Sequence, residues 1–196
     1  MSRIVDRGAI FGAYVGIGMA AVIAVSFLLV IPIEPVYWLL APLSGLLIGY
    51  YANGRSNVVD GQWRRTLSNG LFAGAVTGVS LAAFLIVIKA LFFFGDTGYP
   101  DFNRVDPPTG QQVPPFCVNG AGCVYARYLA QDGGPSRLAA AGITDVGSFT
   151  TFYWTQQGAT AGTILALTIA GGLGGAALYG ISRPRASRLA AAVGER

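Results

Sequence analysis

Residues 8–31 read GAIFGAYVGIGMAAVIAVSFLLVI, and this uncharged run decides the fold class of the chain. A helix needs about 20 apolar residues to cross about 30 Å of hydrocarbon, and this run exceeds that length. Three further stretches, at 36–52, 67–94 and within 151–181 (from residue 155), are also long and mostly apolar. The sequence therefore predicts an all-α integral membrane protein with four transmembrane helices.

The composition agrees with a membrane location. Of the 196 residues, 53% are hydrophobic and only 11% are charged, whereas a soluble domain has about 25% charged residues. These proportions exclude a disordered chain, a coiled coil and an ordinary cytosolic enzyme. The chain has no histidine, which excludes imidazole metal sites, His-ligated haem and Ser-His-Asp catalysis.

Two of the hydrophobic runs have unusual features. The first follows Arg3 and Arg7, as in a cleaved signal peptide, but the apolar core of a signal peptide has only about 7–15 residues. We therefore expect this helix to be retained. The second run contains Pro42, which removes one backbone donor and predicts a kink.

Charges on the two sides of these runs differ in sign. One side has a net charge of +6, with Asp6, Asp60 and Glu195 outnumbered by nine arginines: Arg3, Arg7, Arg55, Arg64, Arg65, Arg183, Arg185, Arg188 and Arg196. The other side has a net charge of −3. Because cytoplasmic loops are rich in arginine, we expect both termini to be cytoplasmic, in a bacterial inner membrane. We attribute the basic tail, 182–196, to anionic lipid and expect no nucleic-acid partner.

The chain then divides into a first part, 1–94, with three membrane helices, a long loop at 95–150, the fourth membrane helix and the tail. We expect the loop to be periplasmic or extracellular. It carries Cys117 and Cys123 on either side of an Asn-Gly turn, and in an oxidising compartment we expect them to form a disulfide; two reduced thiols are the alternative. Short helices are predicted at 124–131 and 136–141.

The two halves of the membrane region resemble each other. Gly8, Gly12 and Gly16 stand four apart, and Gly70, Gly74 and Gly78 repeat this pattern 62 residues later. The second and fourth runs each begin with a Tyr-Trp pair, Tyr37-Trp38 and Tyr153-Trp154, and end in glycines, Gly45 and Gly49 or Gly171 and Gly175. This pattern predicts two similar two-helix hairpins, although glycine is common in membrane helices and a chance likeness is the alternative.

Glycines four apart share one helix face and let a neighbouring helix approach closely. We therefore assign all ten of these glycines to helix packing. Such a face also fits a helix of another subunit, or a lipid tail, a carotenoid or a quinone ring; we expect no other cofactor, and no metal.

Few side chains in the membrane runs offer chemistry. Lys89 is the one ionisable residue, and its long stem allows the ammonium group to reach the headgroups; pairing with a partner's acid or an anionic lipid is the alternative. We expect the two Tyr-Trp pairs at the outer interface, in contact with lipid or a partner. The hydroxyls of the runs are expected to bond within their own helices or across to a neighbouring helix.

These observations predict a protein without catalytic activity. We expect a structural or accessory subunit of a larger bacterial membrane complex, respiratory or photosynthetic, that contacts other membrane subunits through its glycine faces and its outer loop. A small channel or transporter, formed by oligomerisation of the duplicated hairpin, is the alternative; buried acids typical of coupled transporters are missing from the runs. A receptor whose outer loop binds a ligand is a third hypothesis.

Overall fold

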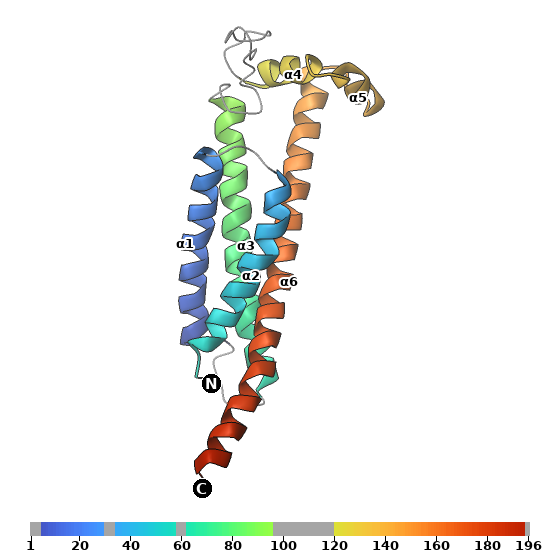
Figure 1. Cartoon of the computed structure of the whole chain (residues 1–196). Helices are drawn as coiled ribbons and strands as arrows, with labels where there is room; N and C mark the ends of the chain where they lie inside the picture. Colours follow the sequence, from blue (N-terminus) through green and yellow to red (C-terminus); the bar gives the residue numbers. More distant parts are fainter. Residues whose placement is uncertain (1–4, 30–33, 58–61, 96–119, 195–196) are drawn as a thin grey trace, which may run out of the picture. The chain divides into compact units, whose positions relative to one another are not determined.

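A computed structural model describes residues 5–29, 34–57, 62–95 and 120–194, and the side chains within these ranges except those of 27–29, 34–37 and 183–194. The described residues form helices and turns only, which confirms the predicted all-α class (Figure 1). The helices are α1 (Arg7–Leu29), α2 (Glu34–Gly54), α3 (Trp63–Phe94), α4 (Ala121–Leu129), α5 (Gly134–Ala140) and α6 (Val146–Gly194).

Three segments of these helices are long and apolar enough to cross a membrane, namely Arg7–Ser26, Trp63–Phe94 and Val146–Ser182. The second predicted run, at 36–52, forms α2, which continues through Pro42. The largest difference from the sequence prediction lies in α6. This helix begins nine residues before Thr155 and extends to Gly194, so part of the predicted loop and most of the predicted tail are helical.

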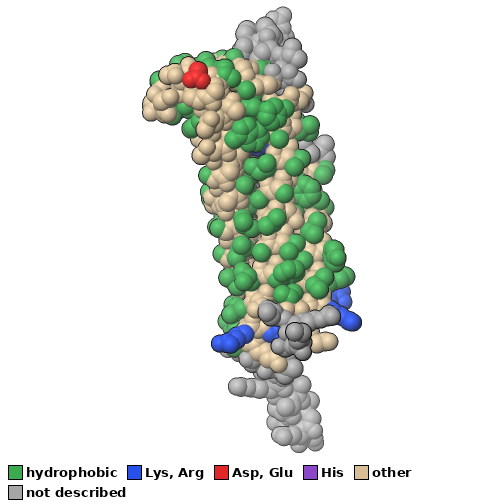
Figure 2. Space-filling model, turned by 180° about the vertical axis from the view of Figure 1, so that it is seen from behind, with side chains coloured by type: hydrophobic (Ala, Val, Ile, Leu, Met, Phe, Trp, Pro, Cys, Tyr) green, Lys and Arg blue, Asp and Glu red, His purple; other side chains and the backbone are tan. Residues whose placement is uncertain are grey.

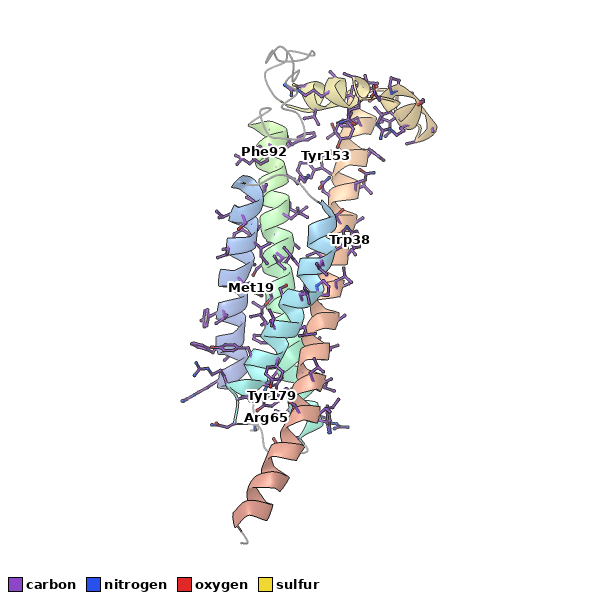
Figure 3. All side chains as sticks on the ribbon, viewed as in Figure 1. Met19, Trp38, Arg65, Phe92, Tyr153 and Tyr179 are labelled. Atoms are coloured by element: carbon purple, nitrogen blue, oxygen red, sulfur yellow. The ribbon has the colours of Figure 1, made fainter. Side chains whose placement is uncertain are left out.

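Contacts divide the chain into two compact units. Unit 1 comprises Met1–Ser26, Ile33–Phe84 and Gly162–Arg196, and it holds most of the four long helices. Its helices alternate in direction, so that the beginnings of α1 and α3 lie beside the end of α2 (Figure 1). Midway along α1, Met19 packs against a small core of Ile48, Ala52 and Ala73 (Figure 3).

Unit 2 comprises Phe27–Pro32 and Leu85–Ala161, and its described part contains the end of α3, α4, α5 and the beginning of α6. Both short helices occur close to the predicted positions. Gly133, with φ of 67°, separates them, and Gly142, with φ of 72°, ends α5. Left-handed backbone of this kind favours glycine, which explains why the helices stop there. The core of unit 2 is Phe93, Val124, Leu138, Ile143, Phe149 and Tyr153.

The surface of the long helices is apolar. Large hydrophobic side chains such as Tyr14, Val22, Leu39 and Val79 are more than half exposed. Figure 2 shows hydrophobic side chains along the helices of unit 1 and Lys and Arg side chains at one end of them. A water-soluble monomer rarely exposes so much continuous apolar surface, whereas lipid accepts it.

Candidate functional site

The glycines of α1 face α2 and α3. A Cβ atom added to Gly8 would lie 2.5 Å from the backbone nitrogen of Ser56, and one added to Gly12 would lie 2.8 Å from the Cβ atom of Ala52. A Cβ atom on Gly16 would overlap the hydroxyl of Thr77. Any larger residue would therefore force these helices apart.

Two glycines of α2 and two of α6 face each other. At Gly45 and Gly49 an added Cβ atom would overlap backbone of α6, at Thr168 and Gly172. At Gly171 and Gly175 it would overlap the carbonyl oxygens of Pro42 and Leu46 in α2. Backbone touches backbone along this contact, as in membrane helix pairs rich in small residues.

The glycines of α3 also face α6. A Cβ atom added to Gly70 would lie 2.6 Å from the carbonyl oxygen of Gly172. One added to Gly74 would lie 3.1 Å from the carbonyl oxygen of Thr168, and one added to Gly78 would lie 2.9 Å from the side chain of Leu165. Gly172 contacts both α2 and α3. The sequence analysis did not single it out, although it lies within the Gly171–Gly175 stretch.

Five hydroxyl groups of the predicted runs bond within their own helices, which is one of the two expected arrangements. Ser44, Thr77 and Thr168 are buried, and each donates to a carbonyl oxygen of its own helix at 2.7–2.9 Å. Ser26 and Ser80 do the same. These hydroxyls need no partner on another helix.

A buried polar cluster, which the sequence analysis missed, connects three helices at the arginine-rich end of unit 1. Asn69 of α3 donates to Oδ2 of Asp6 at 2.9 Å and to Oδ1 of Asn53 at 3.4 Å. Asn53 of α2 donates to the carbonyl oxygens of Gly49 and Thr66. Asn53 and Asn69 are fully buried, and Asp6 is 8% exposed.

Asp6 also has two local roles. Its Oδ1 accepts the backbone N–H of Ala9 at 3.1 Å, which caps the first turn of α1. Its Oδ2 lies 3.6 Å from Nε of Arg65, a residue at the same end of the unit (Figure 3). The position of an Asp directly before an apolar run is a capping signal, but its asparagine partners cannot be read from the sequence.

The predicted aromatic and cationic contact residues fall in different environments. Trp38 is 54% exposed on α2, as expected for a lipid-facing residue, whereas Tyr153 is 5% exposed in the core of unit 2 (Figure 3). The ring centroid of Phe93 lies 4.8 Å from that of Tyr153 and 5.3 Å from that of Trp154. Lys89 lies half-buried in α3, and the side chain of Tyr37 lies outside the described residues.

Of the two cysteines, Cys123 is buried in the first turn of α4, and Cys117 lies outside the described residues. The disulfide between them stays a prediction.

The first half of α6 carries one face of small, exposed residues. We call it the α6 open face; its exposed members are Thr151, Thr155, Gly158, Ala159 and Gly162. A Cβ atom added to Gly158 or Gly162 would have no described heavy atom within 4 Å. Beside it, between the end of α5 and Thr151, Thr155 and Ala159, lies an open depression of about 520 Å³. The Gly158–Gly162 spacing is visible in the sequence but was not singled out.

No protein-family model matches this chain, and neither curated proteins nor solved structures gave a match.

Proposed function

We propose that this chain is a structural accessory subunit of a larger bacterial membrane complex, without catalytic activity of its own. The observation that carries the proposal is the contrast between two sets of glycines. Those assigned to packing contact a neighbouring helix of unit 1, whereas Gly158 and Gly162 face open space. Two small residues one turn apart, which follow the exposed Thr151 and Thr155, are typical of a surface that receives another membrane helix.

The proposal includes a topology with four membrane spans. The grouping of Arg7, Arg55, Arg64 and Arg65 around the Asp6 cluster supports a cytoplasmic location for that end. Helix α2 adds the remaining span to the three long apolar segments, since its glycines are packed against α6 as closely as those of α3 are. Alkaline phosphatase fused after Asn57 should be inactive and fused after Ala130 should be active; the reverse pattern would contradict this topology.

Purification in mild detergent tests the subunit role. We expect other membrane chains to co-purify with the wild type and to be lost from the double variant Gly158→Leu, Gly162→Leu. Gly174→Leu is the matched control, because Gly174 also lies in α6 with nothing within 4 Å of an added Cβ atom. A monodisperse wild-type species that contains only this chain would contradict the proposal.

A second candidate is a channel or transporter formed by several copies. It is favoured by the pairing of helices, since Gly8 and Gly12 contact α2 while Gly70 and Gly74 contact α6, as expected for a duplicated hairpin. Proteoliposomes that contain the purified chain would then show a flux of ions or small solutes. Absence of flux, together with co-purifying subunits, supports the accessory role instead.

A further inference from the structure

At the arginine-rich end of unit 1, one guanidinium group is held in place by aromatic rings. The Cζ atom of Arg55 lies 5.7 Å from the ring centroid of Phe11 and 5.6 Å from that of Tyr51. The two rings belong to α1 and α2, and their centroids are 6.2 Å apart. A cation within about 6 Å of a ring face is attracted by the ring quadrupole, so both rings restrict the position of this side chain.

The backbone around Arg55 is also fixed. Its N–H donates to the carbonyl oxygen of Tyr51 at 3.0 Å, which extends the last turn of α2. A Cβ atom on Gly8 would lie 2.6 Å from the carbonyl carbon of Arg55, so α1 and the end of α2 are in close contact here. The guanidinium group therefore projects from a rigid junction between two helices.

The guanidinium N–H groups of Arg55 have no hydrogen-bond acceptor in the part of the chain that the structure describes, and the side chain is exposed. On the α1 side of this junction, Asp6 is the nearest acidic residue in the sequence. Its carboxylate is buried and bonded to Asn69 and Ala9, and it lies beside Arg65. The Asp6 charge is thus withdrawn from the surface, while Arg7, Arg55 and Arg64 remain exposed. This end of the described unit presents cationic side chains without an exposed acid.

A lipid-facing strip continues from Arg55 along α1. Phe11 is 50% exposed, and Tyr14, one turn further, is 69% exposed. Gly18 and Val22 follow on the same face, and an added Cβ atom on Gly18 would meet nothing within 4 Å. A cation at the end of an apolar strip matches the shape of a phospholipid, with its phosphate at the interface and its acyl chain along the helix.

We propose that Arg55, held over Phe11 and Tyr51, binds the phosphate of an anionic phospholipid whose acyl chain lies along Phe11, Tyr14 and Gly18. The fork of guanidinium N–H groups suits the oxygens of a phosphodiester. The site rests on the membrane location in the proposed function, but it requires no partner subunit.

Native mass spectrometry of the full chain in detergent, with phosphatidylglycerol or phosphatidylcholine added, tests this site. We expect tighter binding of phosphatidylglycerol. Arg55→Ala should weaken it by about tenfold, the loss of one charge-assisted interaction. Arg64→Ala is the matched control, because it removes the same charge from an exposed arginine at the same end, and it should change the affinity by less than about twofold.

The ring contact gives a test that leaves the charge unchanged. Phe11→Leu retains an apolar side chain but removes the ring beneath the guanidinium group, so we expect binding of phosphatidylglycerol to weaken by about threefold. Glycerol phosphate added in excess should fail to displace the lipid, because it lacks the acyl chain. Displacement by glycerol phosphate would show that the site binds phosphate groups in general and would overturn the lipid assignment.

Three results would overturn the site itself: equal binding of the two lipids, equal losses with Arg55→Ala and Arg64→Ala, or an unchanged affinity with Phe11→Leu. Each differs from failure of the proposed function. If the chain were not an integral membrane protein, alkaline carbonate would extract it from membranes, an outcome that is measured independently of lipid preference.

Discussion

Asn69 and Asp6 bond to each other in both directions across 63 positions of the chain. The amide of Asn69 donates to Oδ2 of Asp6 at 2.9 Å, and the backbone N–H of Asp6 donates to Oδ1 of Asn69 at 3.4 Å. The pair fixes the beginning of α1 against the beginning of α3. Because both residues are buried, water cannot take the place of either hydrogen-bond partner.

Removal of the Asn69 amide should therefore destabilise the protein. Asn69→Ala removes the amide that donates to Oδ2 of Asp6 and to Oδ1 of Asn53, and we expect a loss of about 2–3 kcal/mol in the free energy of unfolding. Thermal unfolding in detergent measures it. Asn57→Ala, at an exposed asparagine near the same end, is the control and should change little. Equal stability of the two variants would contradict a structural role for the pair.

Two glycines within long helices should respond oppositely to an added methyl group. Gly49→Ala places a Cβ atom against the backbone of Gly172, which can move only with the whole of α6, so we expect a loss of about 1–3 kcal/mol. Gly174→Ala adds the same atom where nothing lies within 4 Å, and because alanine favours helix by about 1 kcal/mol, stability should be unchanged or rise. Melting temperatures in one detergent compare them directly.

Asp145 should affect the beginning of α6 in a pH-dependent way. Hydrogen bonds from Ser148, and then from the backbone N–H of Gly147, lower the pKa of the Asp145 carboxyl below its ordinary value of 3.8. A lowered pKa in the folded state means that the stabilisation is complete above pH 3.8 and is lost as the pH falls through the folded value. Amide chemical shifts of Gly147 and Ser148 in micelles should follow this titration.

The variant Asp145→Asn should abolish the shift change at both amides while retaining an acceptor at the helix start. Asp132→Asn, at another exposed acid of unit 2, is the control and should leave the titration intact. A wild-type titration with its midpoint above pH 3.8 would show that the hydrogen bonds do not stabilise the charged form.

Thiol labelling tests the predicted disulfide. If Cys117 and Cys123 are paired, a maleimide should label unfolded protein only after reduction, whereas reduced thiols would react at once. Unfolding before labelling is essential, because Cys123 is 5% exposed and burial alone would protect it in the folded protein. Cys123→Ser provides the control, since it leaves a single thiol that is reactive without reductant.

The three helices with long apolar runs, α1, α2 and α3, could be predicted closely from the sequence. The end of α3 at Phe94 and the location of α1 and α2 follow from the length of each run and from its flanking charged or proline residues. Helix α6 begins nine residues before the predicted start at Thr155, because Phe149 and Tyr153 pack in the core of unit 2, whereas Tyr153 was expected at the membrane interface. Their spacing of four places both rings on one helix face, where they pack against Tyr125 and Phe93 instead.

The sequence predicts that the glycines assigned to packing make close helix contacts, but it does not predict which helix each glycine contacts. A run of Gly-x-x-x-Gly indicates a close helix contact, yet it does not say that Gly172 meets both α2 and α3. The Asp6 cluster is harder still to predict. Asn53 and Asn69 stand at helix ends, where asparagine is common and usually faces water, and only the antiparallel packing of the helices buries them together.

The bond between Asp6 and Asn69 has a consequence for biosynthesis. The carboxylate of Asp6 enters the membrane interface long before its amide partner has been translated, and at about 5–20 residues per second the interval lasts about 3–13 seconds. During that time the first two helices are an unfinished hairpin with a polar group exposed at their junction. Insertion of α3 brings the Asn69 amide to Asp6 and completes the junction, so the arrangement of the first two helices becomes fixed only after the third helix has been inserted.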